Sequence, residues 1–177
     1  MPVDRLSDAL SASVTLGATA PLGQTEPDPF ALGKLGKRHQ HVFYGSGTVD
    51  ALMGLNMNLD LGGWSLHGLV RARGSLYENE HGYKGPMMLE AGLGARSSLG
   101  LQGWSFQVRP EIFHETPAAW TGRPAENSGR TELLASAGIA YGFSSGVGLQ
   151  FTAKVPVLTG GSLRVQRGRG PRCGRQW

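Results

Sequence analysis

The chain has 177 residues, of which 28 are glycine, and only 17% are charged. Its formal charge is +4, but five arginines lie among the last fourteen residues, and without them the charge is −1, since +4 minus 5 is −1. The basic pI of about 9.6 therefore belongs to one end of the chain and does not indicate a nucleic-acid-binding domain. No apolar run approaches the roughly 18 residues of a transmembrane helix, which excludes helical membrane spans, and the single cysteine excludes an internal disulfide.

Apolar and polar residues alternate through the first three predicted strands. Residues 10–20 place leucine, valine and alanine on one parity and serine, threonine and glycine on the other, and residues 49–61 and 64–76 repeat the pattern. Side chains alternate across a strand, so each segment has one apolar face. The 49–61 segment is about as long as the 9–11 residues that a tilted strand needs to cross a bilayer, roughly twice the usual length in a soluble domain.

Four further segments show the same alternation, at residues 87–96, 104–112, 130–141 and 147–155, and their charged residues keep to one parity. The connections alternate in length. Tight turns are expected at 62–63, 100–103 and 144–146, and long polar loops at 21–46, 78–86 and 116–129. Up-and-down barrels of bacterial outer membranes have this asymmetry, with short periplasmic turns and longer extracellular loops.

The pattern predicts an all-β fold: an antiparallel, up-and-down transmembrane β-barrel segment of about seven strands. We expect an N-terminal flank at residues 1–9, the barrel segment at 10–158 and a disordered, glycine- and arginine-rich tail at 159–177. Single-chain bacterial barrels generally have an even number of strands, and export requires a signal peptide, which the first residues do not resemble. We therefore expect an incomplete barrel, an internal piece of a longer product, closed by at least one strand from elsewhere.

Parity sorts the strand residues between a lumen and the lipid. The predicted lumen-lining residues are Asp50, Asn56, Asn58, His67, Arg71, Arg73, Glu90, Arg96, Gln107, Arg109, Glu111, Arg130, Glu132, Gln150 and Lys154. Acidic and basic groups nearly balance, so such a lumen should not select strongly for anions. In a narrow barrel these groups would pair across strands and plug the interior, whereas in a wide one they would stay hydrated and line a pore.

Aromatic residues flank the tight turns on the apolar parity. Trp64 and Trp104 directly follow two of the turns, and Tyr141 and Phe143 directly precede the third. Aromatic girdles of membrane barrels lie at the two membrane–water interfaces. We therefore predict that these four side chains are interfacial.

Three short stretches resemble the sequence marks of a known family. They are residues 15–23, Gly45-Ser46-Gly47-Thr48-Val49-Asp50 and Val155-Pro156-Val157. They are similar to marks of the MetA-type phenol-degradation-pathway family of outer-membrane transporters, and the similarity covers most of residues 10–158. The resemblance implies a barrel channel for hydrophobic or aromatic compounds. From the residues alone, Pro21 ends a strand, and the glycines before Asp50 allow a tight approach to the next strand, with Asp50 in a lumen salt bridge or hydrogen bond, or in contact with substrate.

Signals for metal binding and catalysis are sparse. His39 and His41 in the first long loop could bind a metal from one side of an extended segment, but zinc would need further ligands, such as Glu78, Glu80 or His81. No nucleophile elbow, phosphate-binding glycine loop or zinc-protease motif is present, so we expect neither catalytic residues nor an enzyme. We likewise expect no cofactor.

The sequence therefore predicts a bacterial outer-membrane channel or transporter component for small compounds. Its expected partner is membrane lipid and not nucleic acid, while the substrate and the oligomeric state are not specified. In one alternative, a soluble, lipocalin-like barrel turns its apolar face inward around a small hydrophobic ligand. In another, a surface barrel uses its long loops for adhesion or metal binding. Strand length and the positions of Trp64 and Trp104 favour lipid.

Overall fold

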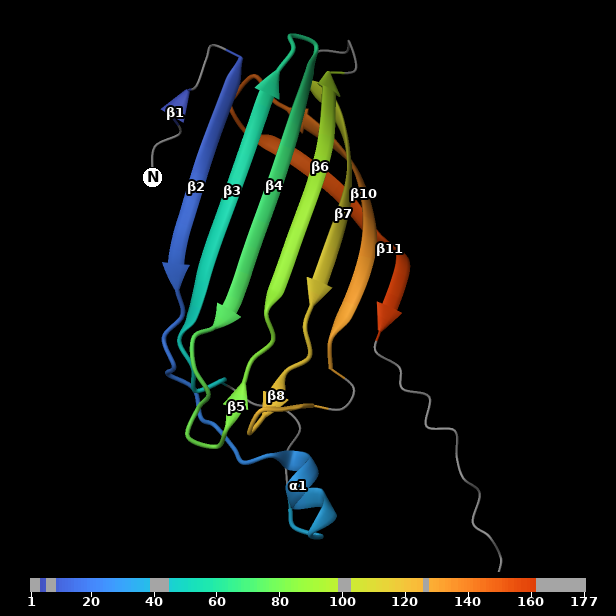
Figure 1. Ribbon diagram of the computed structural model, residues 1–177. Helices are drawn as coiled ribbons and strands as arrows, with labels where there is room; N and C mark the ends of the chain where they lie inside the picture. Colours follow the sequence, from blue (N-terminus) through green and yellow to red (C-terminus); the bar gives the residue numbers. More distant parts are fainter. Residues whose placement is uncertain (1–3, 6–8, 39–44, 99–102, 126–127, 162–177) are drawn as a thin grey trace, which may run out of the picture.

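The structure is a computed structural model that describes residues 4–5, 9–38, 45–98, 103–125 and 128–161 (Figure 1). Seven long antiparallel strands form its main sheet. They are β2 (Leu10–Ala18), β3 (Asp50–Asp60), β4 (Trp64–Ser75), β6 (Met88–Ser98), β7 (Trp104–Glu115), β10 (Arg130–Gly142) and β11 (Gly148–Gly161). A two-residue strand, β1 (Asp4–Arg5), pairs with the outer edge of β2. The predicted all-β fold is confirmed, and a strand occupies each of the seven alternating segments.

The long strands follow one another across the sheet in chain order, each antiparallel to the next. Residues 61–63 join β3 to β4, and residues 143–147 join β10 to β11. By contrast, residues 19–49, 76–87 and 116–129 separate the other described pairs. Figure 1 shows the short connections at one end of the sheet and the long ones at the other, as the predicted turns and loops imply.

The long connections carry small elements of their own below the main sheet (Figure 1). They are α1 (Pro29–Lys34) and a three-stranded sheet of β5 (Tyr83–Lys84), β8 (Ala119–Trp120) and β9 (Arg123–Pro124). The rings of Tyr83 and Trp120 pack with their centroids 4.8 Å apart. Burial, together with the carboxylates of Asp50 and Glu115, raises the pKa of Tyr83, so its hydroxyl stays neutral over a wide range of pH. Among the described helical residues, none forms a helix long and apolar enough to cross a membrane.

Strand β11 extends further than the sequence suggested. It remains paired with β10 through Gly161, three residues beyond the expected boundary at Leu158. The register shifts between Leu133 and Leu134, where Leu158 and Pro156 are their partners and Val157 is the extra residue. Proline is confined to edge strands and bulges because it has no amide to donate, and Pro156 is in both situations.

Burial runs against hydropathy in the inner strands of the main sheet, whereas both faces of β11 are exposed. Along β7, every residue on the apolar parity is exposed, and every residue on the polar parity is half-buried or buried. Leu93 is 73% exposed, whereas Glu111 is 1% and Asp50 4% exposed. Within the described ranges, the buried hydrophobic residues are Leu69 and Ala118. The sheet therefore lacks the apolar core that a water-soluble domain of this size builds.

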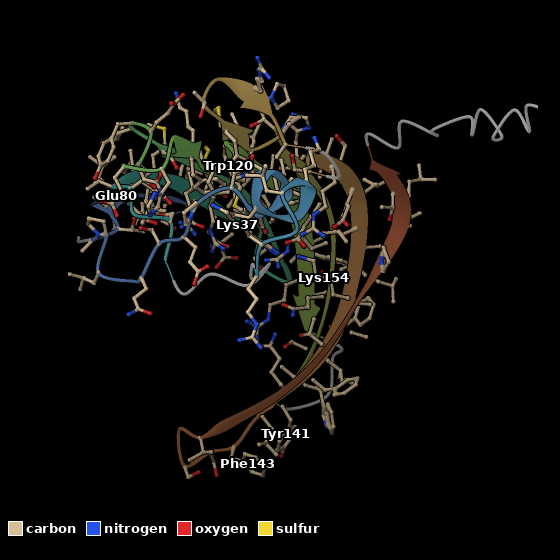
Figure 2. All side chains as sticks on the ribbon, turned by 90° about the horizontal axis from the view of Figure 1, so that it is seen from below. Lys37, Glu80, Trp120, Tyr141, Phe143 and Lys154 are labelled. Carbon is tan, nitrogen blue, oxygen red and sulfur yellow. The ribbon has the colours of Figure 1, made fainter. Side chains whose placement is uncertain are left out.

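The sheet is curled, so its two faces differ in shape. Viewed from below, β10 and β11 swing away in an arc from the remaining strands, and Lys154 lies on the concave side (Figure 2). Because Lys154 belongs to the polar parity, the polar face is concave and the apolar face is convex. In the described part of the chain, β2 and β11 are not paired with each other, so the sheet is open.

Gly45 and Gly23 bring two parts of the first long connection into contact. A Cβ at Gly45 would lie 2.6 Å from the Gly23 Cα atom. Because backbone cannot move aside as a flexible side chain can, we expect Gly45→Ala to lower the free energy of unfolding by about 1–3 kcal/mol. Gly63→Ala is the matched control, since nothing lies within 4 Å of its added Cβ. Thermal unfolding in detergent micelles compares the two variants, and equal losses would contradict the contact.

Candidate functional site

The strand register places all the predicted lumen-lining residues on the concave face. Arg71 lies opposite Glu90, Arg96 opposite Gln107, and Ser136 opposite both Arg109 and Lys154. In an antiparallel pair, directly opposed residues share a face. The shared face is thus established by the pairings, while its contact with a lumen stays a prediction.

Asp50 is the centre of a polar network at the long-loop end of this face. Its Oδ2 atom accepts from Arg73 Nε at 2.8 Å and lies 2.6 Å from Arg73 Nη2. Its Oδ1 atom accepts from the Thr48 and Ser75 hydroxyls, at 2.9 and 2.8 Å. The Asp50 amide also donates to the Thr19 hydroxyl at 3.0 Å. Asp50 therefore forms the salt bridge and hydrogen bonds that were one of its two predicted roles.

Two further ion-pair groups lie on the same half of the face. Arg130 is 3.8 Å from Glu115 and 3.4 Å from Glu132. Arg71 and Glu90 pair at 3.7 Å, with the Arg71 side chain 60% exposed. Exposed pairs at such distances contribute roughly 0–1 kcal/mol each, so these groups neutralise charge more than they stabilise the fold.

Glu111 is contacted by two cations in the middle of the face. Its side chain is fully buried, Arg109 Nε lies 2.7 Å from its Oε1 atom, and Lys154 Nζ contacts its Oε2 atom. These contacts lack hydrogen-bond alignment, so charge attraction compensates the buried carboxylate. Gly92 provides the space, because a Cβ there would lie 2.9 Å from Glu111 Cγ.

Pro110 interrupts the sheet beside this carboxylate. β7 is an interior strand, and a proline within it cannot donate to the ladder. The pairing of β6 with β7 accordingly stops after Gly92 with Glu111 and resumes at Ala95 with Val108.

Sequence reasoning missed several residues of this face. Thr48 precedes the predicted strand, and Ser75 carries no charge, so neither stood out although both contact Asp50. Glu115 has the parity of Glu111 and could have been found by extending the alternation. Phe113 breaks the pattern, because it is an aromatic residue on the polar parity, and the Arg130 guanidinium lies 5.2 Å from its ring centroid.

The aromatic residues at the short-turn end form a cluster on the apolar parity. Trp104 and Tyr141 are cross-strand partners with ring centroids 4.9 Å apart. Phe143 meets Tyr141 edge to face at 4.7 Å. Trp64, on β4 at the same end, is 54% exposed. Their position at a membrane interface stays a prediction.

The predicted metal ligands His39 and His41 lie outside the described residues. Among the residues that the structure does describe, no three His, Cys, Asp or Glu side chains come together as a metal site. His81 lies 3.6 Å from Glu80 in the next long connection. Metal binding by the loops is therefore untested, as are the expected lack of a cofactor and of catalysis.

No family model matches the chain, and neither the curated proteins nor the solved structures give a match. The resemblance to the MetA-type transporter family thus rests on the three short stretches alone and stays a prediction.

Asp50 and Glu90 allow a direct comparison of a buried ion pair with an exposed one. We expect Asp50→Ala to cost about 1–3 kcal/mol, because it leaves Arg73, Thr48 and Ser75 without their acceptor. Glu90→Ala should cost less than about 1 kcal/mol, since its partner is exposed and distant. Chemical unfolding in micelles measures both. A loss for Glu90→Ala as large as that for Asp50→Ala would contradict this ranking.

The Glu111 carboxylate compensates the charges of Arg109 and Lys154, so its removal should destabilise the fold. We expect Glu111→Ala to lower the free energy of unfolding by about 3 kcal/mol, because Arg109 and Lys154 then face each other without a carboxylate. Adding Lys154→Met should restore part of this loss. A double-mutant cycle in micelles tests the coupling, and strictly additive effects would rule it out.

Proposed function

We propose that the chain forms part of the wall of a bacterial outer-membrane β-barrel that acts as a channel or transporter for small compounds. In this proposal the convex apolar face contacts lipid and the concave polar face lines the passage. The inverted burial of the main sheet is the observation that carries it, because no other described part of the chain covers the apolar face.

The convex face is extensive enough to need a covering. Its exposed apolar residues come from all seven long strands and include Val14, Leu16, Met53, Leu55, Val70, Leu93, Phe106, Val108, Ile112, Ile139, Leu149 and Phe151. Water-soluble monomers rarely expose contiguous apolar patches larger than a few hundred square ångströms. Lipid removes this surface from water without a further partner, and the strands have the length that a tilted bilayer span requires.

The direction of curvature favours a membrane barrel over a soluble ligand-binding barrel. A lipocalin-like barrel would need its apolar parity on the concave side. Here Lys154 and the buried Glu111 occupy that side, and the apolar parity lies outside. An ion-paired interior with lipid outside is the arrangement of outer-membrane barrels.

A membrane location also requires partners for the two outer strands. Backbone groups at an open sheet edge in lipid would each cost several kcal/mol, so spanning sheets are closed. We therefore propose that additional strands pair with β11 and with the part of β2 that β1 leaves free. The resemblance to the MetA-type family supports hydrophobic or aromatic compounds as the transported class.

Two tryptophans at opposite ends of the fold test the placement in lipid. We expect brominated lipid to quench a variant that retains only Trp104 severalfold more than one that retains only Trp120, with the other tryptophans replaced by phenylalanine. Trp104 lies on the convex face at the short-turn end, whereas Trp120 belongs to the small sheet of the long connections. The proposal would be contradicted by a protein that stays soluble without detergent and whose two variants are quenched equally by brominated lipid.

Solute release from vesicles tests the passage separately. Vesicles that contain many copies of the full chain, so that strands of neighbouring copies can close the sheet, should release a small entrapped aromatic compound faster than protein-free vesicles. Insertion without faster release would reject the channel role and leave the wall placement standing.

A further inference from the structure

A hollow on the concave face is lined by hydrogen-bond donors and has no carboxylate in its wall. It measures about 300 Å³ and lies between β2, β3 and β4, with Arg109 reaching it from β7. The polar side chains around it include Ser11, Asn56, Asn58, His67 and Arg71. Guanidinium, amide, imidazole and hydroxyl groups can all donate to an oxyanion.

These donors are not consumed by contacts within the protein. The side chains of Asn56, Asn58 and His67 make no hydrogen bond to any other described residue. Arg71 has only the loose pair with Glu90 at 3.7 Å. Arg109 uses its Nε atom on Glu111, which leaves its two terminal nitrogens as further donors. The hollow thus presents donors that have no partner among the described residues, together with the amide and hydroxyl oxygens of the same side chains, but no carboxylate.

Two acidic residues of the face lie beside this hollow, and two are separated from it along the strands. Glu90 is directly opposite Arg71, and Glu111 contacts Arg109 and Lys154. Asn58, His67 and Gly94 lie at one level of the register, whereas Asp50 lies nearer the long loops. Asp60 lies at the opposite end and accepts from the Gly62 amide. Around the hollow, the three cations Arg71, Arg109 and Lys154 thus face two carboxylates, which leaves a local excess of positive charge.

A second hollow adjoins the first and offers apolar surface. It measures about 480 Å³, and the two share Asn56 and Arg71 in their walls. Leu52, Met88 and Phe113 line it, although all three lie on the otherwise polar parity. Glu90 is also in its wall, where it pairs with Arg71. Charged donors and an apolar wall are thus continuous across the shared residues.

We propose that this double hollow binds small organic monocarboxylates. The carboxylate would be held by Arg71, Asn58 and His67, with Arg109 adding charge. The apolar part would lie against Leu52, Met88 and Phe113. Arginine is well suited to the first task, because its planar guanidinium can donate two parallel bonds to a carboxylate. This inference rests on the proposed function, because it names small monocarboxylates as solutes of the proposed channel.

Hexanoate is the probe, and a calorimetric titration of the full chain in detergent micelles, with protein-free micelles subtracted, is the measurement. Asn58→Asp places a carboxylate among the donors without a change in size. We expect it to raise the dissociation constant of hexanoate at least about tenfold, because the added carboxylate repels the bound one. Gln150→Glu is the matched control, because it adds the same charge to the same face outside both hollows and should change the affinity little. Hexan-1-ol and acetate, which lack the charge and the apolar chain respectively, should each bind more weakly than hexanoate.

The inference is overturned if the wild-type chain does not bind hexanoate, if the two variants weaken binding equally, or if hexan-1-ol binds as tightly. Circular dichroism checks that each variant keeps its β-structure. If Asn58→Asp does not fold, Arg71→Gln replaces it, because Arg71 is exposed and loosely paired. A chain that inserts in lipid but does not bind hexanoate rejects this inference alone. Hexanoate binding by a chain that stays out of lipid keeps the site and rejects the channel.

Discussion

The structure depends on the two-sidedness of a β-strand. Each long strand carries charge on one parity and apolar side chains on the other, so a register slip of one residue would move both sets to the wrong face. The ion pairs make such a slip costly, because a slip of β7 would carry Arg109 and Glu111 together to the apolar side and away from Lys154 of β11. The same constraint explains why burial is inverted. The concave face encloses its charges, and no described part of the chain covers the convex face.

The two ends of the sheet are built differently. At the long-loop end, the Asp50 network joins the start of β3 to Arg73 of β4, and a small second sheet lies below it. At the short-turn end, aromatic rings take the place of ion pairs, with Trp104, Tyr141 and Phe143 in contact. Such an asymmetry suits a wall that crosses a boundary between two environments, with a polar passage along its concave side.

The strands, their faces and the ends of their connections could be predicted because alternation is a local signal. The partners of particular charges could not, since the contact between Lys154 and Glu111 depends on a register set by β7, β10 and β11 together. The donor-lined hollow was missed for the same reason, because Arg109 of β7 and Asn58 of β3 both line it although β4 and β6 lie between their strands. The end of β11 at Gly161 was missed because its last two residues are glycines, which have no side chain and so cannot show the apolar–polar alternation.

Accessibility along β7 tests the inverted burial most directly. Nitroxide labels would be placed singly at positions 105 to 113, with Cys173 replaced by serine, in the full chain reconstituted in lipid. We expect collisions with oxygen, which concentrates in lipid, to be most frequent at Phe106, Val108 and Ile112. Collisions with a water-soluble nickel complex should be highest at Ser105 and Gln107, with a period of two. Labels at Phe106 and Val108 that meet the nickel complex as often as their neighbours would contradict a lipid-facing convex surface.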